Sequence, residues 1–175
     1  MRKYVTLLVT LAVSFSLATT PAYAKSVQIA SCKSIKIASG VTHGIALPCL
    51  DGKSNITYQA IRGPVVVNVF GSWCEPCNIE IPHLLAVAGL HKVSFVGVDV
   101  EETNMKAGRN FAIKKGLWWP ILYDSKGSTR GIFGLGVPVT WLIDARGRVV
   151  YKQIGVITST DILKNEIEKY LKVKL

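Results

Sequence analysis

Apolar residues follow two spacings along the chain, one typical of buried strands and one typical of helices. The β-branched runs at 64–70 and 93–100 are apolar on both faces, which predicts two buried strands. The spacing at 77–90 and 103–115 predicts two helices, the second of which ends at Gly116. Because a helix lies between the two buried strands, we expect these strands to run parallel.

The C-terminal part predicts two further strands and a last helix. The strands at 138–143 and 149–154 are joined by a short turn, so they should pair antiparallel. Ser159 is a candidate N-cap for a helix that ends near residue 172. Nearer the N-terminus, apolar segments flank an Asp-Gly pair at 51–52, which indicates a β-hairpin. The resulting order, a hairpin followed by β-α-β-α-β-β-α, predicts an α/β fold.

The first 24 residues have the three parts of a secretory signal peptide. Arg2 and Lys3 are positive, residues 5–18 are uncharged and largely apolar, and the Ala-Tyr-Ala at 22–24 is a small-x-small cleavage site. If the segment is retained instead, it is just long enough to anchor the chain in a bilayer. A third alternative is a lipoprotein processing box at 29–32, although the residues before it are too polar for that role. We therefore expect an extracytoplasmic protein, either secreted or held in the cell envelope.

The remaining composition is that of one folded domain. After the leader comes a polar extension at 25–44, with a short strand expected at 34–38, and then a domain at 45–175 that is long enough to bury a core. The formal net charge of the chain is +10, but the lysines are scattered. Because an exported protein does not meet nucleic acid, this charge predicts a basic surface and no nucleic-acid partner.

The chain has four cysteines, and export decides their chemistry because cysteines outside the cytoplasm tend to pair. Cys74 and Cys77, with two residues between them, form a local pair. Cys32 and Cys49 are left as the second pair, with sixteen residues between them. We expect this second pair to form a structural disulfide that ties the extension to the hairpin.

The local pair has the placement of a redox-active site. The strand ends at Phe70 and a helix follows, so Cys74 should lie at a helix N-terminus, where free amide N–H groups and the helix dipole favour a thiolate. Cys77 lies about one turn further on and should be shielded. We therefore expect Cys74 to be the solvent-facing, attacking cysteine and Cys77 to be the resolving one.

A metal carrier is the alternative from a different functional class. Cys74, Cys77 and His83 would be its copper or zinc ligands. A zinc site needs a fourth ligand, which the spacing does not supply, and a copper chaperone of the CxxxC kind needs one more residue between its cysteines. Metal content after reductive purification, compared with insulin-reduction activity, would distinguish the two functions.

Several segments beyond the cysteines follow a family pattern. A Val-rich strand at 63–72 leads into Trp-Cys-Glu-Pro-Cys at 73–77, and further matching segments lie at 80–82, 120–124 and 136–144. Together they resemble the thioredoxin-fold oxidoreductases of the TlpA/ResA/CcmG type over about residues 45–172. The resemblance implies a thioredoxin-like domain, in which helices flank a central mixed β-sheet, preceded here by the N-terminal extension and the hairpin.

The resemblance also assigns roles to residues outside the cysteine pair. It implies a cis peptide bond before Pro138, which would lie beside the active-site disulfide. We expect Trp73 and the backbone of Val137 to bind the substrate. Asn68 stands where thioredoxin has a buried Asp, and Asn cannot take up a proton. Glu80, one turn along the helix from Cys77, is therefore the candidate base, although it could instead serve only as a partner of the helix dipole.

A peroxiredoxin shares the superfamily but does not match the residues. Its attacking cysteine needs Thr or Ser three positions earlier, whereas Gly71 precedes Cys74 and Ala46 precedes Cys49 at that distance. Neither cysteine therefore qualifies as a peroxidatic residue.

These observations predict an exported thiol–disulfide oxidoreductase that exchanges a CxxC dithiol or disulfide with protein thiols and needs no cofactor. The family resemblance favours a reductant, with the haem-binding thiols of apocytochrome c as one client class. A membrane protein would donate or accept the electrons. The two residues between the cysteines do not fix the redox potential, so the sequence leaves the direction of electron flow open.

Overall fold

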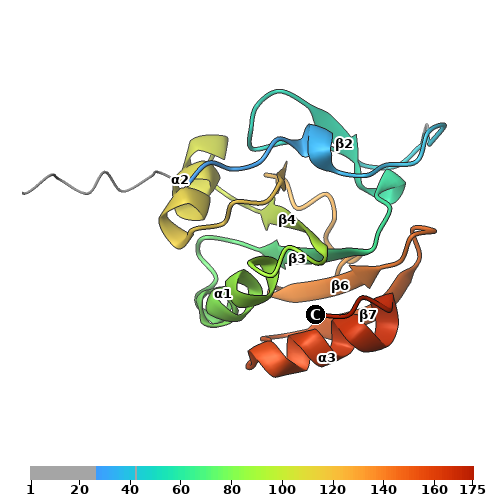
Figure 1. Ribbon diagram of the computed structural model, residues 1–175. Coiled ribbons are helices and arrows are strands. Elements are labelled where there is room, and N and C mark those ends of the chain that lie inside the picture. The colour runs from blue at the N-terminus through green and yellow to red at the C-terminus, as the bar shows by residue number, and fades with distance from the viewer. Residues whose placement is uncertain (1–26, 42) are drawn as a thin grey trace, which may run out of the picture.

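A computed structural model describes residues 27–41 and 43–175, so the predicted signal peptide at 1–24 lies outside the described residues. At its centre is a five-stranded mixed sheet with the strand order β5-β4-β3-β6-β7 (Figure 1). The strands are β3 (Val65–Phe70), β4 (Ser94–Val100), β5 (Ile121–Asp124), β6 (Val139–Ile143) and β7 (Val149–Ile154). The two buried strands predicted from the sequence, β3 and β4, pair in parallel, and β6 and β7 pair antiparallel, so both predictions are confirmed.

Each face of the sheet carries its own core. The three helices are α1 (Glu75–Ala88), α2 (Met105–Lys115) and α3 (Thr160–Leu171). Their buried residues join one hydrophobic cluster, while the N-terminal extension and the hairpin contribute to a second cluster. Strand β3 serves both cores because alternate residues point to opposite faces: Val66 and Phe70 belong to the helix cluster, and Val67 belongs to the other. In Figure 1, α1 and α3 lie below the sheet and the hairpin lies above it.

The N-terminal part differs from the sequence prediction in one element. The predicted hairpin forms, with β1 (Ala46–Pro48) antiparallel to β2 (Asn55–Thr57). The strand expected at 34–38 was wrong: the chain makes a 3₁₀ turn at Cys32–Ser34, capped by the Ser31 side chain, and then a single bridge between Ile37 and Ile61. Ser31 favours a turn here because its hydroxyl accepts the Lys33 N–H, which competes with strand pairing.

A disulfide between Cys32 and Cys49 fastens the extension to the edge of the sheet. Both cysteines are fully buried. Cys49 forms an isolated bridge with Leu122 of β5, and Leu50 N–H donates to the Ile121 carbonyl at 2.8 Å. The segment at 49–50 thereby covers edge strand β5, whose backbone groups would otherwise lack partners on that side.

Removal of this disulfide should cost stability and leave the redox chemistry in place. Closing a loop of this size stabilises a fold by about 3 kcal/mol in the chain-entropy model. We expect the Cys32→Ser/Cys49→Ser double variant to melt at a lower temperature while its rate of insulin reduction stays near wild type. Loss of insulin reduction in a variant that still folds would instead identify the pair as an electron relay.

The described helices include no candidate for a bilayer span. None within residues 27–41 and 43–175 combines sufficient length with sufficient apolar character.

Candidate functional site

The Cys74–Cys77 pair lies where β3 passes into α1. Cys74 is the N-cap of α1, and Pro76 occupies the first turn, where its missing N–H costs no hydrogen bond. The two cysteines form a disulfide with a Cα–Cα distance of 5.3 Å. The Cys74 sulfur accepts the Cys77 backbone N–H at 3.1 Å, so it already occupies the site where a helix N-terminus stabilises negative charge.

The expected solvent exposure of Cys74 is wrong for this disulfide form. The side chain of Cys74 is only 3% exposed and that of Cys77 is fully buried. The reason is that the Cys74 sulfur turns back to cap α1 and packs with the helix-side core. Access to this sulfur therefore differs little from access to its partner, and the difference between the two thiols must come mainly from their hydrogen bonds.

Glu80 is fully buried on the inner face of α1. Its Oε1 accepts a hydrogen bond from Asn68 Nδ2 at 2.7 Å, and its Oε2 accepts the Ile157 backbone N–H at 3.1 Å. Burial raises the pKa of Glu80 from 4.5 to about 7, and these two hydrogen bonds only partly oppose that rise. A carboxyl group with this pKa can take or give a proton near neutral pH.

Asn68 holds Glu80 in place from the central strand. Its amide also donates to Thr140 Oγ1 at 3.2 Å, so both hydrogens of the amide group are used. Sequence reasoning identified Asn68 and Glu80 but missed Thr140 and Ile157. These two residues lie 60 or more positions further along the chain, and no local pattern connects them to the cysteines.

The loop before the cysteines is tied to the end of β4. The Trp73 indole N–H donates to the Val100 carbonyl at 3.2 Å, although the Trp73 side chain remains 56% exposed. Ser72 donates both its backbone N–H and its hydroxyl to Glu102. Glu102 was not identified from the sequence, because an acidic residue after a strand is usually a solvated surface residue.

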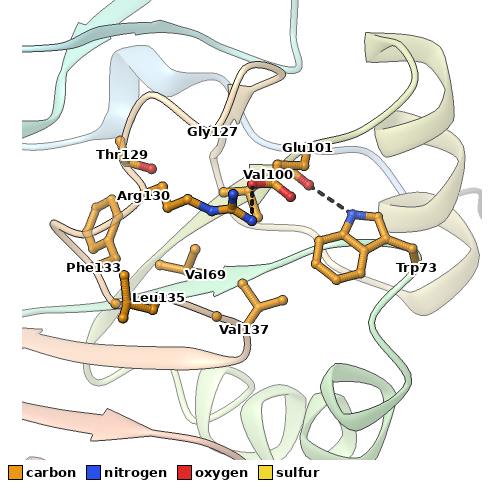
Figure 2. A pocket seen from close by; sticks show the side chains of 12 residues that line it. Val69, Trp73, Val100, Glu101, Gly127, Thr129, Arg130, Phe133, Leu135 and Val137 are labelled. Carbon is orange, nitrogen blue, oxygen red and sulfur yellow. Dashed lines mark hydrogen bonds and ion pairs between the residues drawn. The ribbon is translucent and has the colours of Figure 1, made fainter.

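An apolar hollow lies beside Trp73 (Figure 2). Trp73 and Val137 line it together with Phe133 and the exposed Leu135. Arg130, which also lines it, forms an ion pair with Glu101 at 3.1 Å. The peptide bond between Val137 and Pro138 is cis, and Pro138 itself is buried. The structure thus places the two predicted substrate-binding residues, Trp73 and Val137, around the same hollow.

The residues of the metal-carrier alternative do not come together. His83 lies on α1, but its ring Nδ1 is 3.0 Å from Thr160 Oγ1 at the start of α3. Within the part of the chain that the structure describes, no three His, Cys, Asp or Glu residues are grouped as metal ligands. Cys74 and Cys77 therefore have no third ligand from His83.

Comparison with known proteins gives a consistent result at the level of sequence. Residues 43–152 match the model of the AhpC/TSA family. The thiol-disulfide oxidoreductase ResA of Bacillus anthracis is 34% identical over 128 residues, which make up 70% of each chain. The thiol:disulfide interchange protein CycY of Rhizobium leguminosarum bv. viciae is 30% identical over 109 residues, 61% of this chain and 59% of CycY.

Solved structures agree with the fold. DsbF of MTB, solved in mixed oxidised and reduced forms, has a TM-score of 0.63 at 26% identity and covers 72% of this chain and 94% of its own. StoA from Bacillus subtilis has a TM-score of 0.57 at 24% identity, covering 69% of this chain and 93% of StoA. The likeness to StoA concerns the fold alone.

Proposed function

The chain belongs to the AhpC/TSA family and is a thioredoxin-fold thiol–disulfide oxidoreductase of the ResA type, and from this premise we propose that Cys74 and Cys77 exchange disulfides with client proteins outside the cytoplasm. The observation that carries the proposal is the Cys74–Cys77 disulfide at the N-terminus of α1. Cys74 would be the attacking residue, since its sulfur already accepts the Cys77 backbone N–H.

The proposed reaction has two exchange steps. The Cys74 thiolate attacks a client disulfide, which forms a mixed disulfide and releases one client thiolate. The Cys77 thiolate then attacks the Cys74 sulfur, which releases the second client thiolate and leaves the Cys74–Cys77 disulfide. The client gains two electrons and the protein loses two. A partner dithiol, which we place in a membrane protein, must reduce the protein again, and no organic cofactor takes part.

Glu80 would serve the second step. Cys77 must lose its proton before it can attack, and Glu80 lies one turn along α1 from it. A pKa of about 7 suits a group that takes a proton from a thiol near neutral pH. Asn68 supports this role because it orients the carboxylate and cannot compete for the proton.

The hollow beside Trp73 would receive the client. An extended client segment could pair with the backbone of Val137, next to Pro138, while an apolar client side chain fills the hollow between Val137 and Trp73. Leu135, which is 86% exposed, adds apolar surface to the lining of this hollow. We infer that clients carry an apolar residue close to the reacting cysteine.

We infer the direction and the place of the reaction from the family resemblance and the leader. The ResA-type resemblance favours a reductant whose clients include the haem-binding thiols of apocytochrome c. Export is supported by the leader pattern at 1–24 and by two proteins with this fold that are described as secreted, a Mycobacterium tuberculosis disulfide oxidoreductase and a Corynebacterium glutamicum thiol-disulfide isomerase.

An insulin-reduction assay tests the activity. With dithiothreitol as reductant, the wild-type protein should accelerate insulin precipitation well above the rate with dithiothreitol alone, and Cys74→Ser should not. Metal analysis of the same reduced sample separates this function from the carrier alternative. Stoichiometric copper or zinc together with inactivity toward insulin would contradict the proposal.

N-terminal sequencing tests export. If the leader is removed after Ala24, the protein recovered from outside the cytoplasm should begin at Lys25. An intact N-terminus in the membrane fraction would indicate a retained anchor, and a chain that begins with a lipidated Cys32 would indicate a lipoprotein. Either result would contradict cleavage at 24, and the lipidated form would also exclude the Cys32–Cys49 disulfide.

A further inference from the structure

A second buried carboxyl group lies behind the active-site loop, apart from Glu80. Asp99, on β4, is fully buried, and neither of its carboxylate oxygens has a hydrogen-bond partner among the described residues. Gly108 of α2 packs directly against the Asp99 carboxyl group, so closely that a Cβ at position 108 would collide with Asp99 Oδ2. A buried carboxylate without donors is unfavourable, so this group needs either a proton or a function that holds it there.

Glu102, three residues further on, connects this buried group to the cysteines. Its Oε1 accepts the Ser72 backbone N–H at 2.5 Å, and its Oε2 accepts the Ser72 hydroxyl at 2.9 Å. Ser72 lies two residues before Cys74, whose own N–H closes a turn onto the Gly71 carbonyl at 3.1 Å. Both oxygens of Glu102 thus hold the loop that places the Cys74 sulfur at the N-terminus of α1.

Asp99 and Glu102 form a pair of unequal acids. The pKa of Asp99 is raised to about 8, first by burial and then by the nearby carboxyl group of Glu102. At neutral pH Asp99 therefore holds a proton. Beside it, both carboxyl oxygens of Glu102 accept hydrogen bonds from Ser72.

Among the described residues, no salt bridge joins a cation to either carboxyl group of the pair. From β5, Tyr123 donates its hydroxyl to the Glu102 carbonyl at 3.5 Å, and its pKa is raised, chiefly by burial. On α2, the Arg109 guanidinium bonds to the Leu50 carbonyl instead. The neighbouring Glu101 is already paired with Arg130. Ionisation of Asp99 would thus place a second negative charge beside Glu102 with no described counter-ion.

We propose that Glu102 is a positioning residue for the attacking cysteine and that Asp99 is its proton-carrying partner. Loss of the Asp99 proton then weakens the two hydrogen bonds that Glu102 accepts from Ser72. The inference rests on the proposed function only in naming Cys74 as the attacking residue. It adds a second proton site to the reaction centre, on the side of α2, whereas Glu80 serves Cys77 from α1. Thiol reactivity at Cys74 should therefore depend on a carboxyl group that does not contact the sulfur.

The first experiment detects the proton directly and needs no redox activity. In the oxidised Glu80→Gln variant, infrared spectroscopy at pH 7 should show the C=O band of a buried protonated carboxyl group, and this band should disappear as the pH rises through about 8. The band should be absent from Glu80→Gln/Asp99→Asn. A band that persists in the double variant, or no band at pH 7 in Glu80→Gln, would overturn the assignment of the proton to Asp99.

The second experiment measures the apparent pKa of Cys74 by alkylation across the pH range, in a Cys77→Ser background that leaves Cys74 as the free thiol. Glu102→Ala, which removes both acceptor oxygens, is compared with Glu101→Ala, which removes the same charge one residue away. Loss of a negative charge alone should lower the pKa of Cys74, as we expect for Glu101→Ala. Loss of the loop contact should raise the pKa of Cys74 by about one unit, because the helix N-terminus no longer holds the sulfur.

The sign of the shift therefore decides the role of Glu102. An increase for Glu102→Ala that Glu101→Ala lacks supports positioning, and a decrease in both variants overturns it. Asp99→Asn should remove the second inflection, near pH 8, from the reactivity profile; an unchanged profile overturns the coupling of Asp99 to the loop. If Glu102→Ala fails to fold, Ser72→Ala removes one of the two bonds from a partly exposed position and should shift the pKa in the same direction. These readouts use no client, so failure of the insulin assay would not affect them.

Discussion

Cys77→Ser should turn the protein into a trap that stays covalently attached to its clients, whereas Cys74→Ser should capture almost none. In the structure, the Cys74 sulfur occupies the N-cap of α1 and accepts the Cys77 backbone N–H at 3.1 Å. The same N–H group can stabilise the Cys74 thiolate once the disulfide is reduced. Cys77 is fully buried one turn further along and receives no comparable donor among the described residues. The sulfur that gains the hydrogen bond and the helix dipole should have the lower pKa and should attack first.

The effect on turnover should be very large in both variants. Each lacks one of the two thiols that the exchange needs, so client reduction should fall by roughly a thousandfold or more in either case. The two variants differ in where the reaction stops. Cys77→Ser completes the first exchange and cannot release the client, while Cys74→Ser cannot begin. Non-reducing electrophoresis followed by mass mapping of the linked peptides separates these outcomes.

Alkylation of the reduced wild-type protein provides an independent measure. At mildly acid pH the reagent should label Cys74 before Cys77, because only the thiolate reacts. Labelling of Cys77 first, or more captured client with Cys74→Ser, would mean that the polarity of the pair is reversed. In the oxidised form the two side chains differ by only three percentage points of exposure, so such a reversal could not be attributed to access.

The parts of the fold that the sequence predicted are those with a local signal. The β-branched run of β3 and the helical spacing of α1 each span several residues, and the cysteine motif lies between them. Strand β5 was not predicted, because its four residues, Ile121–Asp124, are too few to show a period. Its pairing with β4 and its cover by the segment at 49–50 come from parts of the chain that are distant in sequence.

The same distinction between local signals and long-range contacts applies to the candidate site. The motif and the family pattern were sufficient to single out Cys74, Cys77 and Glu80 as candidates. The exposure of Cys74 was predicted wrongly, because the position of a residue at a helix terminus does not reveal which way its sulfur turns. Asp99 and Glu102 were missed because buried acids cannot be recognised from composition: the Glu-Glu after β4 looks like a solvated turn until α2 and Ser72 are placed against it.

Glu80→Gln should reverse the order of stability between variant and wild type as the pH is raised. The folded-state pKa of Glu80, about 7, lies above its unfolded value of 4.5. Below pH 4.5 the carboxyl is neutral in both states, so its contribution to stability is fully present. That contribution is lost as the pH rises through 7, because the buried group must ionise, and the loss amounts to about 3 kcal/mol.

The glutamine variant has a different pH dependence because it cannot ionise. Its amide can accept a hydrogen bond from either Asn68 or the Ile157 N–H, but its own N–H₂ must face the other donor, so one hydrogen bond is lost at a cost of about 1 kcal/mol. We therefore expect Glu80→Gln to be about 1 kcal/mol less stable than wild type at pH 4.5 and about 2 kcal/mol more stable at pH 8. Denaturant unfolding of the oxidised proteins at several pH values measures both differences.

The same substitution should slow the chemistry at the pH where it stabilises the fold. Without a carboxylate to take the Cys77 proton, release of the client from the mixed disulfide at pH 7 should slow by roughly a hundredfold, and the pH profile should lose its inflection near 7. Glu75→Gln is the matched control, since Glu75 lies exposed in the first turn of the same helix and senses the same dipole. If Glu80→Gln and Glu75→Gln give the same stability curve and the same release rate, Glu80 only complements the helix dipole. If Glu80→Gln alone crosses the wild-type stability curve and loses the inflection, one buried carboxyl group destabilises the fold at neutral pH because it serves the second exchange step.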